Sequence, residues 1–276
     1  MLSKDEVMAD FRLALLSREI ALLAHREVLS GKAKFGIFGD GKEVAQIALA
    51  RTFKDGDWRS GYYRDHTFMM ATGITNAEQF FYQVYGHTDE KLNPGSAGRN
   101  FNNHFASQSV NADGSWNKLA DMKNSCADLS PTAGQMPRLV GLGYASKLFR
   151  ENPELAKMTQ FSHGGNEVAF GTIGDAATAE GHFFEAMNAA AVLQIPVAMT
   201  VWDDGYGISV TKDKQIVKES VSRALEGFRK EEESNGMLIY HVLGWDYPEM
   251  VRLFAEGVKR CREEHIPVLF HVDEMM

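Results

Sequence analysis

The sequence predicts an α/β fold in which a doubly wound parallel sheet carries helices on both faces and follows an N-terminal helical extension, residues 1–57. Apolar, β-branched stretches at 168–174 and 195–202 flank an alanine-rich stretch at 179–194, a pattern typical of a strand–helix–strand unit with parallel strands. The alternation of strand and helix patterns continues toward the C-terminus. With 276 residues, 44% hydrophobic and 24% charged, the chain has the composition of a soluble globular protein, and we expect a single domain, residues 1–276.

Charge and cysteine content argue against several classes of protein. A net charge of −8 is unfavourable for binding nucleic acid or an anionic membrane. Cys126 and Cys261 lie far apart and form no CxxC pair, which favours a reducing cytoplasm and no structural zinc. No apolar run approaches the length of a membrane span, and the N-terminus lacks a signal-peptide pattern, so we expect a cytoplasmic protein.

The first half of the chain is expected to be mainly helical. A long helix at 4–30 has an apolar face, and a small-residue helix follows at 42–53. A short strand then ends within 58–66 (WRSGYYRDH) and leads into a short helix. The apolar face of the first helix consists of Phe11, Leu15, Leu16, Ile20, Leu22 and Leu23.

An irregular region at 87–128 is rich in asparagine and lacks a hydrophobic period, which predicts a long ordered loop or lid. Beyond it, a helix at 135–149 contains Gly141 and Gly143. Glycine costs about 1 kcal/mol relative to alanine in a helix, so we expect this helix to pack closely against a sheet or a partner subunit. The remaining elements are an amphipathic helix at 216–233, a strand at 237–243, a helix at 248–264 and a strand at 266–272.

Acidic side chains follow two neighbouring parallel strands. Asp175 comes directly after the strand at 168–174, and Asp204 comes shortly after the strand at 195–202. Both strands end at one edge of the sheet, where open α/β sheets bind their ligands. Carboxylates held close together repel each other unless a cation lies between them, and Mg²⁺ takes carboxylate oxygens together with phosphates. The pattern therefore predicts a metal–phosphate site, the alternative being a helix cap at Asp175 and a turn at Asp204.

The stretch 171–209 resembles the thiamine diphosphate fingerprint, a Gly-Asp-Gly followed roughly thirty residues later by Asn-Asn. It is most similar to the α-type half of the thiamine diphosphate-dependent, decarboxylating component of 2-oxo-acid dehydrogenase complexes. Members of that family show GDGATSEGxFxEAxN and then NNGYAIS. This chain reads GDAATAEGHFFEAMN at 174–188 and DDGYGIS at 203–209. The resemblance implies the thiamine diphosphate-binding fold.

The resemblance also implies site residues by position. The metal ligands fall on the side chains of Asp175 and Asp204 and on the backbone carbonyl of Tyr206. His104, within a Gly-Arg-x-x-x-x-His spacing, is implied as the catalytic residue near the reacting carbon, and histidine suits acid–base work near neutral pH. The other cofactor-binding residues implied are Tyr63, Arg64, Ser130, Thr132, Gly174, Ala176 and Ala177.

Two further sites are implied in the same way. A monovalent-cation site for K⁺, which some members use to order a loop, would correspond to Leu129, Pro131, Gly134 and Gln135. The segment that lines the substrate pocket in the family corresponds to Phe35, Ile37 and Phe38, for which a plain core position is the alternative.

This chain departs from the family pattern at two places. Ala176 replaces the last glycine of the fingerprint and adds a methyl group where the backbone passes close to the ligand. Asp203-Asp204 replaces Asn-Asn. We expect the carboxylate of Asp204 to remain an oxygen ligand, to tighten metal binding and to repel the diphosphate.

The activity that the resemblance implies is decarboxylation of a 2-oxo acid with thiamine diphosphate and Mg²⁺, followed by transfer of the acyl group to a lipoyl acyltransferase. Branched-chain 2-oxo acids are the first choice of substrate, pyruvate the second and acetoin the third. The family needs a β-type half as partner, and a His-Ser/Thr-rich loop follows its last strand. Because neither is found here, we expect a fragment of a longer product, inactive alone and oligomeric.

Two other functions stay open. One is a catalytically incomplete module that binds the cofactor or partner subunits without turnover. The other is a nicotinamide-binding oxidoreductase, which shares the strand–helix–strand core. The sequence has no GxGxxG that opens a helix after a strand, which disfavours the second.

Overall fold

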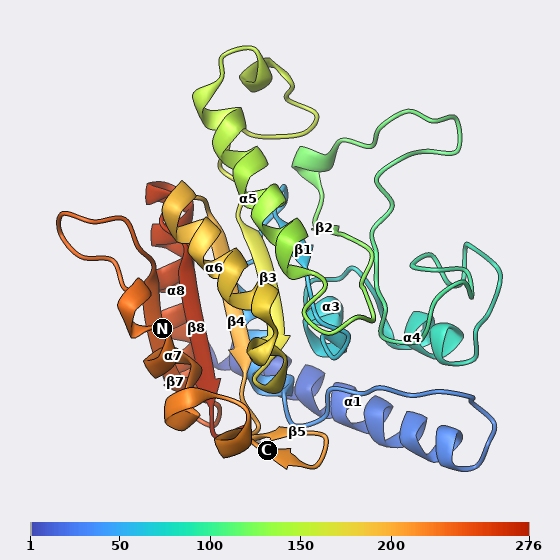
Figure 1. Cartoon of the computed structure of the whole chain (residues 1–276). Coiled ribbons are helices and arrows are strands. Elements are labelled where there is room, and N and C mark those ends of the chain that lie inside the picture. The colour runs from blue at the N-terminus through green and yellow to red at the C-terminus, as the bar shows by residue number, and fades with distance from the viewer. Residues whose placement is uncertain (1, 276) are drawn as a thin grey trace.

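A computed structural model describes residues 2–275 and contains one six-stranded sheet in the order β2-β1-β3-β4-β8-β7 (Figure 1). All five pairings in this sheet are parallel, so the chain returns across a sheet face between successive strands. The predicted α/β fold is confirmed, as is the short strand expected within 58–66, and only β2 of this sheet was not indicated by the sequence. The strands are β1 (Trp58–Ser60), β2 (Asn124–Ser125), β3 (Ala169–Gly174), β4 (Val197–Trp202), β7 (Leu238–Leu243) and β8 (Val268–Asp273).

Side chains of the central strands enter two hydrophobic cores, one on each face of the sheet. Phe170 of β3 belongs to the core under α2 (Glu43–Ala50) and α8 (Tyr247–Glu264). Its neighbour Ala169 belongs to the core under α5 (Met136–Glu151) and α6 (Gly181–Leu193). This alternation follows from the two-residue period of a strand, and it confirms the doubly wound arrangement.

Helix α5 lies directly against the sheet, which confirms the expected close packing of its glycine-rich sequence. A Cβ atom built at Gly143 would lie 2.8 Å from Val197 of β4. A Cβ atom built at Gly141 would meet nothing within 4 Å, so only Gly143 is required by the contact.

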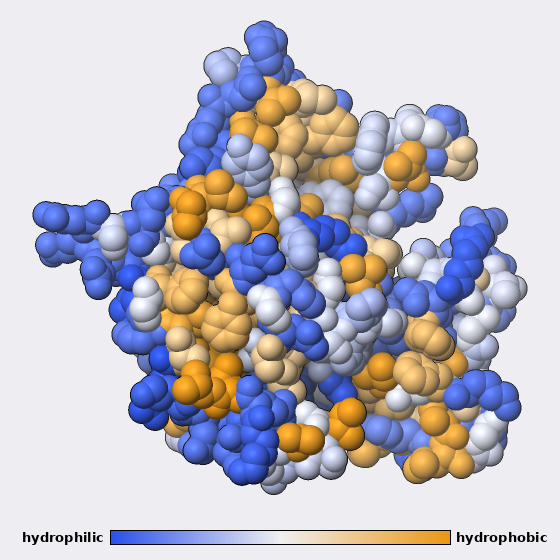
Figure 2. All heavy atoms as spheres, viewed as in Figure 1, coloured by the Kyte–Doolittle hydropathy of each residue, from blue (hydrophilic) through white to orange (hydrophobic). Residues whose placement is uncertain are grey.

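The predicted N-terminal extension, residues 1–57, contains α2 and α1 (Lys4–Leu29), and α1 contacts α2, α3 (His66–Ala71) and α4 (Ala77–Val84). Ser3 and Glu6 form a capping box at its beginning. The prediction that the apolar residues of α1 form its packing face is wrong, because Ile20 is the one residue of that face that is buried. The buried side of α1 is otherwise made of small residues, Ser17, Ala21 and Ala24. Phe11, Leu15, Leu16, Leu22 and Leu23 are exposed, and Figure 2 shows apolar side chains gathered where α1 runs.

The predicted helix at 216–233 is wrong. Only Val221–Ala224 (α7) is α-helical there, flanked by short 3₁₀ turns at Val217–Glu219 and Glu226–Phe228. Lys218 and Glu219 have φ of 66° and 52°, which a right-handed helix cannot contain. Val221 and Leu225 still bury their side chains against the sheet, so tertiary packing uses the apolar positions without a continuous helix.

The long loop at 87–128 is irregular over most of its length, as predicted, but it ends in a short 3₁₀ turn at Leu119–Asp121 and the edge strand β2, which the sequence did not indicate. Figure 1 shows the loop extending beyond the sheet on the side of β2. None of the helices within residues 2–275 is both long enough and apolar enough to cross a membrane.

Candidate functional site

A cleft of about 1060 Å³ opens where β3 and β4 end. Gly174 and Trp202 are paired in register as the last residues of these strands. Asp175 follows immediately, and its backbone N–H donates to the Trp202 carbonyl at 3.1 Å. Asp175 and Asp204 both line the cleft, so the predicted convergence of the two acidic segments is confirmed.

Asp175 is held in an environment that disfavours an isolated carboxylate. It is 4% exposed, and within residues 2–275 its Oδ2 atom has no hydrogen-bond partner. Burial, and then the negative charges of Asp203 and Asp204, raise the pKa of Asp175 to about 7. Buried carboxylates are normally paired or bound to a metal. An unsatisfied oxygen beside two further carboxylates therefore fits a bound divalent cation.

Asp204 lines the cleft, and both of its carboxylate oxygens accept hydrogen bonds. Its Oδ2 atom accepts a hydrogen bond from the Nζ atom of Lys42 at 2.6 Å. Its Oδ1 atom accepts from the Tyr206 backbone N–H at 3.3 Å. Tyr206 lines the cleft and opens the antiparallel hairpin formed by β5 (Tyr206–Gly207) and β6 (Val210–Thr211). Sequence reasoning missed Lys42, because 162 residues separate it from Asp204.

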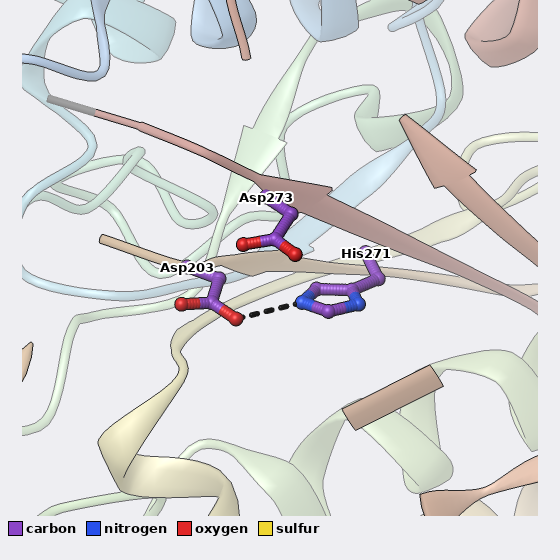
Figure 3. A group of neighbouring side chains, drawn as sticks. All are labelled: Asp203, His271 and Asp273. Carbon is purple, nitrogen blue, oxygen red and sulfur yellow. Dashed lines mark hydrogen bonds and ion pairs between the residues drawn. The ribbon is translucent and has the colours of Figure 1, made fainter. Parts of the chain in front are cut away.

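Asp203 belongs to a cluster with His271 and Asp273 at the ends of β4 and β8, shown in Figure 3. His271 Nε2 lies 2.8 Å from Asp203 Oδ2, and the other ring nitrogen of His271 lies 2.9 Å from Ser222 Oγ. The ligand atoms of Asp203, His271 and Asp273 lie within 4.8 Å of one another, as in a metal site. The Lys212 ammonium already contacts both carboxylates, at 3.4 and 3.0 Å. The cluster therefore anchors the loop that carries Asp204.

The turn after β1 brings Tyr63 and Arg64 to the cleft. Its geometry depends on Asp65, whose Oδ2 atom accepts hydrogen bonds from the Tyr62 backbone N–H at 3.1 Å and from Arg59 Nη2 at 2.7 Å. The Arg64 guanidinium lies 5.3 Å from the ring centroids of Tyr62 and Tyr63, and it donates a hydrogen bond to the Tyr62 hydroxyl. Stacking of this kind holds the planar cation toward the cleft.

His104 lies buried behind the wall of the cleft, and the exposed Ser130 lies next to it. His104 Nε2 is 2.7 Å from Ser130 Oγ, and its ring stacks on Tyr63 with 6.1 Å between centroids. Burial lowers the pKa of His104, so the neutral imidazole is favoured at pH 7. Thr132 lines the cleft, whereas His104 and Ser130 do not. His104 contacts the lining of the cleft through the ring of Tyr63.

Some of the remaining predicted residues line the cleft, and the others lie outside its lining. Gly174, Ala176 and Ala177 line the cleft, as do Ile37 and Phe38. Phe35 stacks on Phe101 instead, with 4.7 Å between the ring centroids. The candidate cation residues around Gly134 form a tight turn, in which the Gly134 N–H donates to the Pro131 carbonyl at 2.9 Å. His25 Nε2 and Asp40 Oδ1 lie 3.2 Å apart, and this hydrogen-bonded pair, which the sequence did not indicate, also lines the cleft.

Ala176 is compensated at position 207, where the chain also differs from the family pattern. The resembling family has glycine at the first position and alanine at the second, and this chain has the reverse. A Cβ atom built at Gly207 would lie 2.6 Å from the Ala176 Cβ and 2.7 Å from Gln215 Oε1. The space between the fingerprint turn and the hairpin thus holds one methyl group. In this chain Ala176 supplies it, whereas in the family pattern the alanine at the position of Gly207 would supply it.

We therefore expect Gly207→Ala alone to lower the free energy of unfolding by about 1–3 kcal/mol, as overpacking does. The double variant Ala176→Gly/Gly207→Ala should recover most of this loss, because the Gln215 side chain can move aside. Urea denaturation of the single and double variants measures the coupling. Gly227→Ala is the control, since a Cβ there would meet nothing within 4 Å. Strictly additive losses would show that the two positions do not share the space.

Comparison with known proteins agrees with this architecture. The sequence model of the family described as "Dehydrogenase E1 component" matches residues 12–274. The chain is 28% identical to the 2-oxoisovalerate dehydrogenase subunit alpha of Bacillus subtilis (strain 168), over 97% of this chain and 70% of that protein. It is 24% identical to the pyruvate dehydrogenase E1 component subunit alpha of Acholeplasma laidlawii, over 97% of this chain and 64% of that protein.

The mitochondrial 2-oxoisovalerate dehydrogenase subunit alpha of Homo sapiens is 22% identical, over 97% of this chain and 52% of that protein. The chain thus spans between about half and 70% of the length of these three relatives. The match of the family model extends over nearly all of the sequence, from the first helix to the last strand. The chain belongs to the dehydrogenase E1 component family.

Proposed function

We propose that this chain is the thiamine diphosphate- and Mg²⁺-binding half of a dehydrogenase that decarboxylates a 2-oxo acid and passes the acyl group to a lipoyl acyltransferase. The observation that carries the proposal is Asp175, a buried carboxylate with an unsatisfied oxygen at the joint end of two parallel strands. The names of the relatives favour a branched-chain 2-oxo acid, with pyruvate second.

Different residues of the cleft would bind the metal ion and the diphosphate. Asp175, Asp204 and the Tyr206 carbonyl would bind the metal ion. Tyr63 and Arg64, on the turn after β1, would bind the diphosphate, and Ser130 and Thr132 would approach it from the other side. When bound, thiamine diphosphate supplies the carbanion and the electron sink for decarboxylation, while the protein supplies position and electrostatics. The backbone at Gly174, Ala176 and Ala177 would complete the cradle.

His104 remains the candidate for the catalytic acid–base residue. Its Nε2 atom is held by Ser130, so proton transfer would require this contact to open toward the cleft. The proposal includes a β-type half as partner, an oligomeric assembly, and K⁺ near Gly134. The position of His104 behind the cleft wall favours one alternative, a module that binds the cofactor or a partner without turnover.

Isothermal titration of thiamine diphosphate tests the proposal. Saturable binding is expected in the presence of Mg²⁺ and none after chelation with EDTA. Thiamine without the diphosphate should bind far more weakly, because the polar groups of the cleft would bind the phosphates and the metal ion. Binding that persists unchanged in EDTA would contradict the metal site. Release of CO₂ from labelled 3-methyl-2-oxobutanoate, measured with a β-type half added, separates an enzyme half from a binding module.

A further inference from the structure

Lys42 is a buried cation inside the cleft. It is 4% exposed, lines the cleft, and lies directly before the first residue of α2. Its ammonium contacts Asp204 Oδ2 at 2.6 Å. Lysine is almost never buried to this extent without a charged partner, and a lone buried charge is costly. The ion pair with Asp204 therefore explains how Lys42 is tolerated in this position.

Three of the four acidic residues at the strand ends contact a lysine of the chain, and Lys212 is shared between Asp203 and Asp273. Asp203 contacts His271 and Lys212, and Asp204 contacts Lys42. Asp175 has an oxygen with no partner in the described chain. Asp175 is thus the one carboxylate of these four that has no lysine partner within the described residues.

We infer that Lys42 is a further binding residue of this site, which neutralises Asp204 so that the pair acts as a neutral ligand toward a metal–diphosphate. The inference rests on the proposed function. An ion pair of this kind has the net charge of an asparagine side chain, the residue at this position in the resembling pattern. The expected repulsion between Asp204 and a diphosphate is thereby removed, while the Asp204 oxygens remain hard ligands for Mg²⁺.

The inference predicts a specific coupling between positions 42 and 204. Lys42→Gln leaves the Asp204 charge uncompensated beside the diphosphate, so the Kd for thiamine diphosphate at saturating Mg²⁺ should rise at least about tenfold. Asp204→Asn should leave the Kd nearly unchanged or lower it, because Lys42 is then free to approach the phosphate. In the double variant Lys42→Gln/Asp204→Asn, the penalty of the first substitution should largely disappear.

Calorimetry of these three variants, with thiamine diphosphate and with inorganic pyrophosphate as probes, tests the coupling. Lys54→Gln is the matched control, since Lys54 lies exposed just beyond the other end of α2. An equal loss from Lys42→Gln in both backgrounds would overturn the inference, because Lys42 would then act independently of Asp204. No loss in the presence of Asp204 would overturn it as well.

A second readout separates this inference from the proposed function. If the unaltered protein binds neither probe, the proposed function fails, and the pair is tested by thermal unfolding of the ligand-free protein. Each single substitution should then lower Tm, and the double variant should be more stable than the sum of the two losses predicts. Purely additive changes in Tm would overturn the neutralisation of Asp204 by Lys42.

Discussion

Asp175→Asn is expected to stabilise the ligand-free protein and to abolish Mg²⁺-dependent binding of thiamine diphosphate. The carboxylate is buried without a partner for Oδ2, and its pKa is raised to about 7. The neutral amide of asparagine avoids the cost of burying that charge near Asp203 and Asp204. The gain in unfolding free energy at pH 8 should be on the order of 2–4 kcal/mol. Loss of binding follows because an amide is a weaker metal ligand and carries no charge.

The gain should depend on pH in a defined direction. A raised carboxyl pKa contributes stability that is fully present below the pKa of the unfolded chain and is lost as the pH rises through the folded value. For Asp175 this window runs from the usual aspartate pKa of 3.8 to about 7. The advantage of asparagine should therefore grow across this window and stay constant above it. In the unaltered protein, Mg²⁺ affinity should rise through pH 7, because metal and proton compete for the same carboxylate.

Urea denaturation between pH 4 and 8, combined with calorimetry, measures both effects. Asp55→Asn is a suitable control, because Asp55 is exposed and lies outside the cleft. An Asp175→Asn variant that still binds thiamine diphosphate with unchanged Mg²⁺ dependence would rule out Asp175 as a metal ligand.

Arg59→Met is expected to lower the unfolding free energy by about 3–5 kcal/mol and to weaken cofactor binding by the protein that remains folded. Arg59, Asp65 and Asp128 have fully buried side chains, and the guanidinium contacts both carboxylates. Removing the cation leaves two buried carboxylates without compensation. Asp65 then keeps its hydrogen bonds from Thr172 and Trp202 but loses its cationic partner, which weakens the anchor of the turn with Tyr63 and Arg64.

Arg262→Met separates the two parts of this prediction. Arg262 forms a buried pair with Asp57, at the opposite end of β1 from the cleft. Its loss should also destabilise the protein, yet leave the Kd for thiamine diphosphate unchanged under conditions where both variants are folded. If Arg59→Met affected stability alone, the network would support the fold and not the geometry of the site.

The convergence of Asp175 and Asp204 could be predicted because it depends on short-range patterns. Two apolar strands joined by one helix are parallel, so both must end at the same edge, and residues that follow them meet. The glycine content of the helix at 135–149 predicted close packing against a sheet or a partner subunit, and Gly143 meets the sheet. Positions such as Tyr63 and Arg64 were implied by resemblance, and the structure places them on the cleft wall.

The failures concern interactions that no local pattern contains. The helical pattern at 216–233 is interrupted by Lys218 and Glu219 in left-handed conformations, because burial of Val221 and Leu225 against the sheet outweighs local helix propensity. The apolar face expected for α1 is exposed, because its small residues make the contact with the domain.

The sequence by itself determined the order of strands and helices around the cleft, the two acidic segments at its edge and the family pattern that they resemble. These depend on residue periodicity and on the rule that a strand–helix–strand unit is parallel. Only the tertiary structure decided the electrostatics of the site. Lys42 reaches Asp204 across 162 residues, and His104 turns to Ser130 behind the wall. Such contacts depend on where distant segments meet, and the free energy of a buried charge depends on every group around it.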